Sequence, residues 1–412
     1  MLGVSSRCMA DAFGEVDELC RAAVSDGTVP GLVVGATDQG RQRLRASWGW
    51  AALEPHRVLA TVETVYDVAS LTKAIATSIL AMQAVRDGRL ALATSVADLL
   101  PELAAPGHEP DRDRALQDRA SDDHAPRAPD DSSWRRAMQV HHLLSHSGGF
   151  PAHRPFHELP GVTRARILKA AAREPLLHPP GQQSLYTDIG FMLLGSILER
   201  VADDTGLEIL FARGVARPLG LSVTRFVRTD DGGAERARLL GRGTVAATER
   251  VPARGGTRGR VLVGEVHDPN AFAMGGVAGH AGLFSNLDEL DALAEALVLD
   301  WQGHGSERLV PRDLLREFWT PAGVPHSTWR LGWDGPAPTG PSQAGQLLSR
   351  GAVGHLGFTG CSLWIDPERA RWIVILGNRI HSACPRTDAF ARSGRACTMR
   401  SWKHLRQERD RP

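Results

Sequence analysis

The sequence contains few lysines, tyrosines and cysteines, although it is 412 residues long. Only three of its 48 basic residues are lysines (Lys73, Lys169 and Lys403), and its two tyrosines are Tyr66 and Tyr186. Arginine stays protonated whereas a desolvated lysine can lose its proton, so few positions can supply a basic amine. The five cysteines are odd in number and include no Cys-x-x-Cys pair. This pattern argues against a disulfide framework or a thiolate zinc site and favours a reducing compartment.

The sequence also lacks an excess of one charge and a long apolar run. The 48 Lys and Arg residues balance 47 Asp and Glu residues, so there is no electrostatic reason to expect a nucleic-acid or anionic membrane partner. Residues 1–15 lack the apolar core of a signal peptide, and no segment reaches transmembrane length. We therefore expect a cytoplasmic protein of one or two compact domains that binds neither nucleic acid nor membrane.

The most informative stretch begins a helix at Ser70. Between Ser70 and Asp87 the apolar residues recur three or four positions apart, which predicts a helix with one buried face, and Gly88 ends it. Ser70 stands at the N-cap or in the first turn, and Lys73 lies one turn later on the same face. The free N–H groups of a helix start favour the negative charge on an attacked carbonyl oxygen, and a neutral amine can take the hydroxyl proton. A serine cap beside a solvated lysine is the simpler interpretation of this motif taken alone.

Patterns of apolar residues predict strands near both ends of the chain and helices between them. The strand-like runs cover residues 31–36, 44–51, 361–365 and 372–376, and a turn at 38–40 joins the first two into a hairpin. Helical periodicity covers residues 10–26, 70–87, 189–201 and a segment from about 286. This order predicts one sheet built from both ends of the chain, carrying a helical insert.

Three segments lack such patterns. Residues 104–133 are dominated by Pro, Asp, Arg and His, and we expect them to form a flexible surface insertion. Residues 228–260 are rich in Gly and Arg and are expected to be loop. The tail from His381 has no sustained apolar period and is expected to be poorly structured. Limited proteolysis should then cut first in the insertion and in the tail.

Two later stretches carry residue types that suit acyl-transfer chemistry. In Gly181–Gly190, Tyr186 is a phenol that a nearby lysine would make a better base, and Asp188 stands directly before a predicted helix. In Gly354–Gly360, three glycines let the backbone approach a ligand closely, and an exposed N–H there suits an oxyanion hole. Taken alone, these stretches have simpler interpretations: Asp188 caps the helix, Tyr186 packs, and His355 is an exposed histidine in a glycine-rich turn.

Other motifs point to alternative chemistries less well. Ser145–Gly149 matches the nucleophile elbow only in part, because its first position is serine and Pro151 follows at once. His142 and His146 have helical i, i+4 spacing but no glutamate between them, which makes a metal site improbable. Gly275–Gly282 has neither the GxGxxG nor the P-loop pattern, so we expect no nucleotide site.

Three short motifs follow one another along the chain: Ser70-x-x-Lys73, Tyr186-x-Asp188 and His355-x-Gly357. In this order they resemble the motifs of the serine β-lactamase and penicillin-binding protein superfamily. The tyrosine is typical of the branch that holds class C β-lactamases, D,D-peptidases of that type and related esterases. The resemblance covers roughly residues 10–380. The chain departs from the β-lactamases of the family at Asp188, where they carry asparagine, and at His355, where they carry lysine.

The resemblance implies an α/β (α+β) fold of the β-lactamase/D,D-peptidase type, with an antiparallel sheet flanked by helices and a mainly helical inserted domain. The family usually places a helix of the tail against the sheet, and this sequence offers no good candidate. The implied parts are one catalytic unit over 1–380, made of a sheet domain at about 10–87 and 261–380 and a helical part at about 88–260, followed by a tail over 381–412.

The resemblance also implies roles for individual residues. Ser70 would attack a carbonyl carbon and form an acyl-enzyme, while Lys73 and Tyr186 would manage the proton. The backbone N–H groups of Ser70 and Phe358 would form the oxyanion hole. The implied substrate-binding residues are Asp188, His355 and Gly357. No cofactor and no metal are implied.

The two departures favour an esterase that acts on small-molecule esters with short acyl groups. A histidine is mostly neutral at pH 7, so His355 attracts a substrate carboxylate less than a lysine would. An ionised Asp188 only accepts hydrogen bonds, whereas an asparagine donates to an amide carbonyl. The alternatives are a β-lactamase or D,D-carboxypeptidase, and a family member that has lost catalysis and serves as a binding or scaffold protein. The sequence leaves the oligomeric state open.

Overall fold

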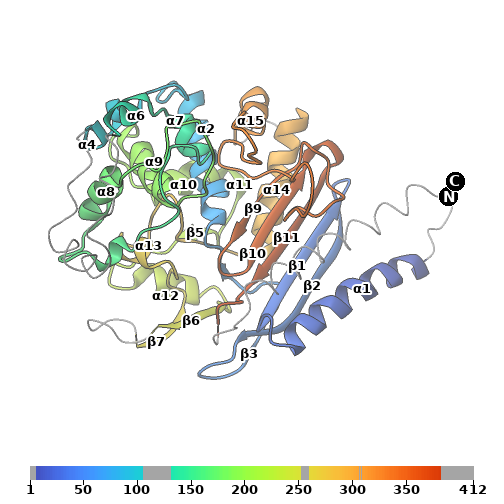
Figure 1. The fold of residues 1–412 in the computed structure, drawn as a ribbon. Helices are drawn as coiled ribbons and strands as arrows, with labels where there is room; N and C mark the ends of the chain where they lie inside the picture. Colours follow the sequence, from blue (N-terminus) through green and yellow to red (C-terminus); the bar gives the residue numbers. More distant parts are fainter. Residues whose placement is uncertain (1–5, 105–130, 252–258, 306, 308, 382–412) are drawn as a thin grey trace.

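The strands predicted near the two ends of the chain lie side by side in one antiparallel sheet of six strands, in the order β3-β2-β1-β11-β10-β9 (Figure 1). The computed structural model describes residues 6–104, 131–251, 259–305, 307 and 309–381. The strands are β1 (Gly31–Asp38), β2 (Arg41–Ala52), β3 (Val58–Leu59), β9 (Val353–Gly357), β10 (Cys361–Asp366) and β11 (Arg371–Gly377). The hairpin at 38–40 and the sheet formed from both ends of the chain are therefore confirmed.

Helices cover both faces of this sheet. Leu32 and Val34 of β1 pack in a cluster with Val16 and Cys20 of α1 (Ser6–Ser25), while Val33 belongs to the larger core on the opposite face. On that face the strands contact α14 (Leu287–Gln302), whose N-cap Asn286 accepts a hydrogen bond from the Glu289 N–H. Because both faces are covered, β1 and β11 are apolar along nearly their whole length and do not alternate with polar residues.

The other half of the molecule is mainly helical and lies beside the edge of the sheet that β9 forms (Figure 1). Its helices are α3 (Val96–Leu99), α4 (Pro101–Ala104), α6 (Ser132–Ala137), α7 (Val140–Leu144), η2 (Phe156–Glu158), α8 (Arg164–Arg173), α9 (Ile189–Arg200), α10 (Leu207–Phe211), η3 (Ala212–Ala216), α11 (Arg217–Leu219) and α12 (Ala234–Leu240). Further helices are α13 (Pro269–Ala273), α15 (Arg312–Phe318) and η4 (Pro367–Arg369). Two short sheets complete the fold: β4 (Tyr66–Asp67), β8 (Leu283–Ser285) and β5 (Arg225–Phe226), and β6 (Ala247–Val251) with β7 (Arg260–Val263).

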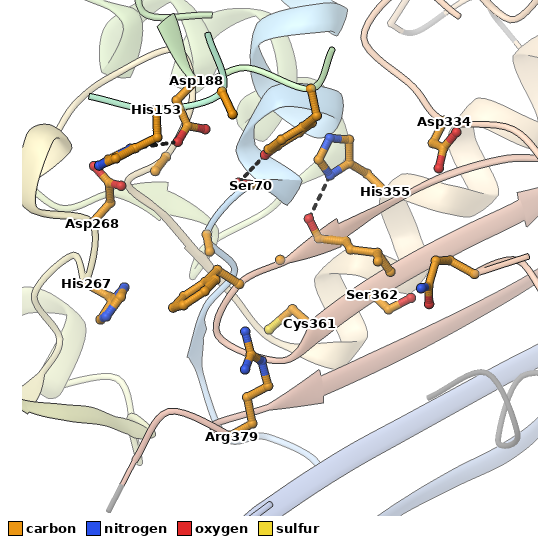
Figure 2. A pocket seen from close by; sticks show the side chains of 18 of the residues that line it. Ser70, His153, Asp188, His267, Asp268, Asp334, His355, Cys361, Ser362 and Arg379 are labelled. Atoms are coloured by element: carbon orange, nitrogen blue, oxygen red, sulfur yellow. Dashed lines mark hydrogen bonds and ion pairs between the residues drawn. The ribbon is translucent and has the colours of Figure 1, made fainter. Parts of the chain in front are cut away.

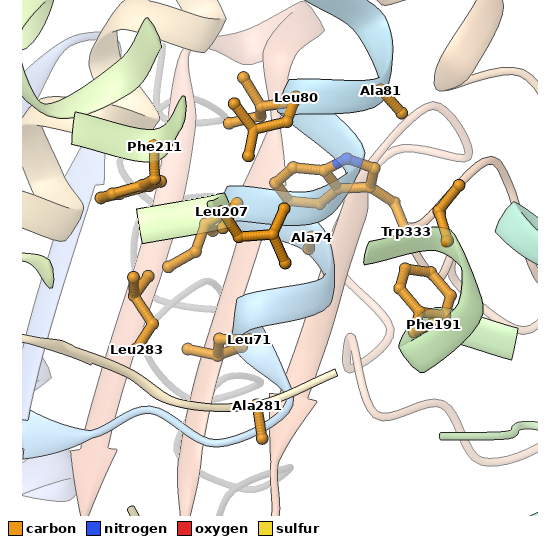
Figure 3. Close-up of a cluster of buried hydrophobic side chains, with 14 of the residues drawn as sticks. Leu71, Ala74, Leu80, Ala81, Phe191, Leu207, Phe211, Ala281, Leu283 and Trp333 are labelled. Carbon is orange, nitrogen blue, oxygen red and sulfur yellow. The ribbon is translucent and has the colours of Figure 1, made fainter. Parts of the chain in front are cut away.

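The helix predicted from Ser70 runs between the two halves. It consists of η1 (Lys73–Ser78), a π-helical segment, and α2 (Ile79–Arg86), and it is surrounded by apolar side chains (Figure 3). Leu71 and Ala74 are fully buried, and Phe191 and Trp333 pack in the same core. A π-helical segment inside an α-helix is rare and is frequently found at functional sites.

Two of the segments predicted to be irregular lie between the elements of the helical half. The described part of residues 228–260 is not simply loop, because it contains α12, β6 and the start of β7. Each of these elements is short, and each carries an exposed arginine: Arg238, Arg250 and Arg260. Most of the predicted insertion, 105–130, lies outside the described residues. Its flanks are ordered, since Ala104 ends α4 and the buried Asp131 pairs with Arg135 at 2.7 Å.

The predicted tail also lies outside the described residues, apart from its first member. His381 is buried and joins two distant segments, because its Nε2 accepts a hydrogen bond from the Leu53 N–H and its Nδ1 donates to the Thr248 carbonyl. The ordered chain therefore includes His381. No described helix is long and apolar enough to cross a membrane.

Candidate active site

Ser70 lies on a tight turn between β4 and the first turn of the helix. The preceding residue, Ala69, has a φ of 46°, a left-handed conformation that side chains other than glycine rarely adopt. The buried Asp67 carboxylate holds this turn, since Oδ1 accepts from the Ala69 N–H and Oδ2 accepts from the His267 N–H, both at 2.8 Å. The Thr72 hydroxyl donates to the Ala69 carbonyl at 2.6 Å. These three hydrogen bonds hold the strained turn in place. Strained backbone that its surroundings hold in this way is typical of functional sites.

Lys73 is fully buried beneath Ser70 and connects the residues that the sequence placed in two separate motifs. Its Nζ lies 3.1 Å from the Ser70 Oγ, 2.8 Å from the Tyr186 hydroxyl and 2.7 Å from Asp188 Oδ1. It also donates to the His280 carbonyl at 3.2 Å. The alternative of a solvated lysine beside a serine cap is therefore wrong.

Tyr186 completes a triangle with Ser70 and Lys73. Its hydroxyl donates to the Ser70 Oγ at 2.8 Å, so it does more than pack. Asp188 occupies the N-cap position of α9 but makes no side-chain capping bond, because its carboxylate is directed to Lys73 instead. The simpler interpretations of these two residues are wrong for that reason.

The buried charges in this cluster depend on one another. Burial disfavours the ammonium of Lys73, but the neighbouring Asp188 carboxylate and Tyr186 outweigh it and raise the pKa of Lys73. Burial opposes ionisation of Asp188 as well, yet Lys73 brings the pKa of Asp188 well below its ordinary value. Burial raises the pKa of Tyr186, and the nearby Lys73 offsets this only in part. The resting cluster therefore holds an ammonium, a carboxylate and a neutral phenol.

The third motif lies on the edge strand β9 and in the turn that follows it. His355 is buried within the strand, so the expectation of an exposed histidine in a turn is wrong. Its Nδ1 donates to the Leu356 carbonyl at 2.7 Å, which leaves Nε2 as the unprotonated nitrogen. Burial, reinforced by the charge of Lys73, lowers the pKa of His355 to about 3. The imidazole is thus neutral at physiological pH.

Ser70, Tyr186, Asp188, His355 and Phe358 all line one pocket of about 730 Å³ between the sheet and the helical half (Figure 2). Within the described chain, the backbone N–H groups of Ser70 and Phe358 donate to no other group. Gly357 makes the close approach of the β9 end to the serine turn possible, because a Cβ there would lie 2.5 Å from the Val68 carbonyl oxygen.

The pocket also contains side chains that the motifs did not single out. His153 lies 3.5 Å from Asp188 Oδ2, and Asp268, which also lines the pocket, has its Oδ1 2.9 Å from Nε2 of the buried His280. His153 follows Gly149, the last residue of the stretch Val140–Gly149, by four positions, and its closeness to that stretch was the available signal. No group of three or more His, Cys, Asp or Glu side chains suited to a metal ion occurs among the described residues. The buried Cys361 carries a free thiol.

A serine hydroxyl bonded to a buried lysine and a tyrosine, on a strained turn beside two unpaired backbone N–H groups, defines a serine hydrolase. The family model described as Beta-lactamase matches residues 16–395, and the chain belongs to that family. Among its relatives is a protein of Escherichia coli (strain K12) named "Putative D-alanyl-D-alanine carboxypeptidase". The two are 32% identical over 364 residues, which cover 82% of this chain and 76% of the relative.

Solved structures confirm the β-lactamase/penicillin-binding-protein-like fold. One is EstCE1, described as a hydrolase with promiscuous acyltransferase activity, with a TM-score of 0.68 and 21% identity over 95% of this chain and all of that one. Another is the octameric penicillin-binding protein homologue from Pyrococcus abyssi, with a TM-score of 0.65 and 20% identity, covering 92% of this chain and 75% of that one. At these identities the similarity concerns the fold.

Proposed function

We propose that the protein is a carboxylesterase that works through an acyl-enzyme on Ser70. The observation that carries this proposal is the triangle of Ser70, Lys73 and Tyr186, with three sides of 2.8 to 3.1 Å. Lys73 and Tyr186 both donate to the Ser70 Oγ in the resting state, so once the pair has lost a proton, one of them lies within hydrogen-bond distance to accept the serine proton. Small-molecule esters or amides are the substrates that such a nucleophile attacks.

In the proposed reaction, the Lys73–Tyr186 pair first loses a proton to solvent, and the Ser70 Oγ then forms a bond to the substrate carbonyl carbon while its own proton moves to the pair. The carbonyl π electrons move to the oxygen, and the N–H groups of Ser70 and Phe358 stabilise the resulting negative charge. The carbonyl double bond then re-forms, the bond between the carbonyl carbon and the ester oxygen breaks, and the alcohol leaves with the proton that the pair had accepted. Water then repeats the same steps on the acyl-enzyme, which releases the acid and restores Ser70.

The preference for esters rests on His355 and Asp188. His355 is neutral and buried, so the third motif offers no cation to the carboxylate of a β-lactam or of a peptide C-terminus. Asp188 is ionised and engaged by Lys73, so it repels an amide carbonyl oxygen and donates nothing to it. The exposed apolar side chains of Leu356 and Phe358 at the pocket suit an uncharged acyl or alcohol group.

A D,D-carboxypeptidase is the second candidate, and two observations favour it. The relatives at 30 to 32% identity carry that name. In addition, the Arg379 guanidinium lines the pocket 4.6 Å from the centre of the Phe358 ring, where it would attract the carboxylate of a peptide. If this candidate is right, Arg379 takes over the part that the third-motif lysine plays in the β-lactamases of the family.

The comparison that tests the proposal is kcat/KM for p-nitrophenyl acetate and butyrate, for nitrocefin, and for an N-acylated D-Ala-D-Ala peptide. We expect efficient ester turnover, and weak or no turnover of nitrocefin and the peptide. Mass spectrometry after labelling with a fluorophosphonate should locate the adduct on Ser70. Nitrocefin or peptide turnover equal to ester turnover would contradict the proposed preference.

Two variants make the comparison specific. The double variant Asp188→Asn/His355→Lys should raise nitrocefin turnover relative to ester turnover, by about tenfold, because it restores an amide donor and a cation. Arg379→Gln separates the two candidates. It should leave p-nitrophenyl butyrate hydrolysis unchanged, whereas for a carboxypeptidase it would raise the KM for the peptide.

A further inference from the structure

His153 is the second partner of Asp188 and lies at the mouth of the pocket. Its Nδ1 is 3.5 Å from Asp188 Oδ2 (Figure 2). The other carboxylate oxygen of Asp188 is 2.7 Å from the Lys73 Nζ. The His153 side chain is 47% exposed and the Asp188 side chain 17% exposed, so His153 exchanges protons freely with solvent. One carboxylate therefore stands between a buried amine and an accessible imidazole.

The backbone fixes this arrangement. The Asp188 N–H donates to the Ala152 carbonyl at 3.0 Å, and the Thr187 hydroxyl donates to the Pro151 carbonyl at 2.6 Å. These two bonds tie the segment that carries His153 to the segment that carries Asp188. The imidazole is thus held beside the carboxylate by its own backbone.

Other charges near His153 are few. Asp268 lines the same pocket and acts on the charge of His153, but it is bonded to His280 Nε2 and to the Ala271 N–H. Arg154, the next residue, is paired with Glu174 at 2.5 Å. Lys73 lies behind Asp188. The Asp188 hydrogen bond is the main cause of the raised pKa of His153, so at a given pH a larger fraction of this imidazole is protonated than of a free histidine.

In the proposed acyl-enzyme reaction the Lys73–Tyr186 pair must lose a proton, and the pairing of His153 with Asp188 favours that loss. To accept the Ser70 proton, the Lys73–Tyr186 pair must first lose one, and the Asp188 charge opposes that loss at both residues. An imidazolium at His153 partly neutralises Asp188 and repels the ammonium, so the proton leaves more readily. This holds whether Lys73 or Tyr186 gives it up.

We propose that His153 is a positioning residue that, through Asp188, lowers the pH at which the Lys73–Tyr186 pair becomes able to accept the Ser70 proton. The inference rests on the proposed acyl-enzyme at Ser70. It concerns acylation only, and is independent of whether the natural substrate is an ester or a peptide.

The test is the second-order rate of Ser70 labelling by a fluorophosphonate, measured from pH 5 to 9 on the full chain. In His153→Gln the rate should fall about threefold or more at the pH values where His153 is protonated and approach the parent rate at higher pH, because only the imidazolium offsets the Asp188 charge. His153→Arg keeps a positive charge at every pH, so its rate should equal or exceed that of the parent. His157→Gln, a histidine four residues away that does not line the pocket, is the matched control and should leave the rate profile unchanged.

A loss in His153→Gln by the same factor at every pH would overturn the inference, because it would indicate a merely structural role. NMR titration of the His153 ring in the parent and in Asp188→Asn tests the pairing without any turnover. The pKa of His153 should fall in Asp188→Asn, and an unchanged value would also overturn the inference. If Ser70 is not labelled in any variant, the proposed function fails, and the NMR titration still decides whether the two residues are paired.

Discussion

At the scale of single residues, the catalytic candidates were the most predictable part of the molecule. Ser70, Lys73, Tyr186 and Asp188 were inferred from residue type, spacing and resemblance, and the structure brings them within hydrogen-bond distance of one another. Their roles remain predictions. The part of His153 was not predictable, because its pairing with Asp188 depends on a contact across 35 positions of sequence that no short motif encodes.

Replacing Lys73 with arginine tests whether the buried amine takes part in proton transfer. Lys73→Arg keeps the positive charge but cannot lose its proton, so labelling of Ser70 should fall about a thousandfold, nearly as far as in Ser70→Ala. The measurement is the fluorophosphonate labelling rate at pH 8. Lys169→Arg makes the same change on an exposed position of α8 and serves as the control. Near-normal labelling of Lys73→Arg would leave Lys73 with an electrostatic role only.

At the scale of secondary-structure elements, long periodic segments were predicted well and strained or short ones were not. The helix after Ser70, α9 and the late strand pair follow their apolar patterns closely. The π-helical geometry of η1 was not predictable, since it arises from tertiary packing and not from residue spacing. The left-handed Ala69 was equally hidden, because alanine gives no signal of a positive φ.

The close approach of β9 to the serine turn gives a prediction for Gly357. In Gly357→Ala the new Cβ would meet the Val68 carbonyl oxygen at 2.5 Å, so the strand end and the serine turn must move apart. The Phe358 N–H moves with the strand. We expect kcat/KM for p-nitrophenyl acetate to fall about tenfold or more, with a loss of roughly 1–3 kcal/mol in stability.

Gly14→Ala is the control for this variant, since a Cβ at Gly14 in α1 meets nothing within 4 Å. It should leave turnover unchanged and raise stability by roughly 0.5–1 kcal/mol, because alanine favours a helix. Thermal unfolding and steady-state kinetics measure both effects. Unchanged turnover in Gly357→Ala would show that the β9 end does not position the site.

At the scale of the whole molecule, the architecture followed from the order of the elements, and the position of the site followed from where its two halves meet. Ser70 comes from the start of the connecting helix, Tyr186 from the helical half and His355 from the sheet. The protonation states of the buried side chains were not predictable, because they depend on burial. The neutral state of His355 and the depth of Lys73 follow from packing between elements far apart in sequence.

Several histidines buried in a neutral state should make the fold sensitive to acid. Burial lowers the pKa of His142 to about 4 and that of His355 to about 3, from 6.5 in an unfolded chain. As pH falls below 6.5, the unfolded chain binds protons that the folded chain refuses, so the free energy of unfolding decreases until the folded pKa is reached. Each such histidine contributes at most about 1.4 kcal/mol per pH unit. Burial raises the pKa of Asp291 from 3.8 to about 6. As pH falls between these two values, Asp291 therefore increases the free energy of unfolding, which is opposite to the effect of the histidines.

Urea unfolding at pH 7.5, 6.5 and 5.5 measures this slope. The parent should lose stability from pH 6.5 to 5.5, and His355→Gln should lose less over the same interval, by up to about 1.4 kcal/mol, because one histidine no longer titrates. His304→Gln, at an exposed position, should leave the slope unchanged. If the parent and His355→Gln show equal slopes, then His355 is protonated within the folded protein at pH 5.5. The third motif would then present a cation after all, and the argument for uncharged esters would fail together with the argument for acid sensitivity.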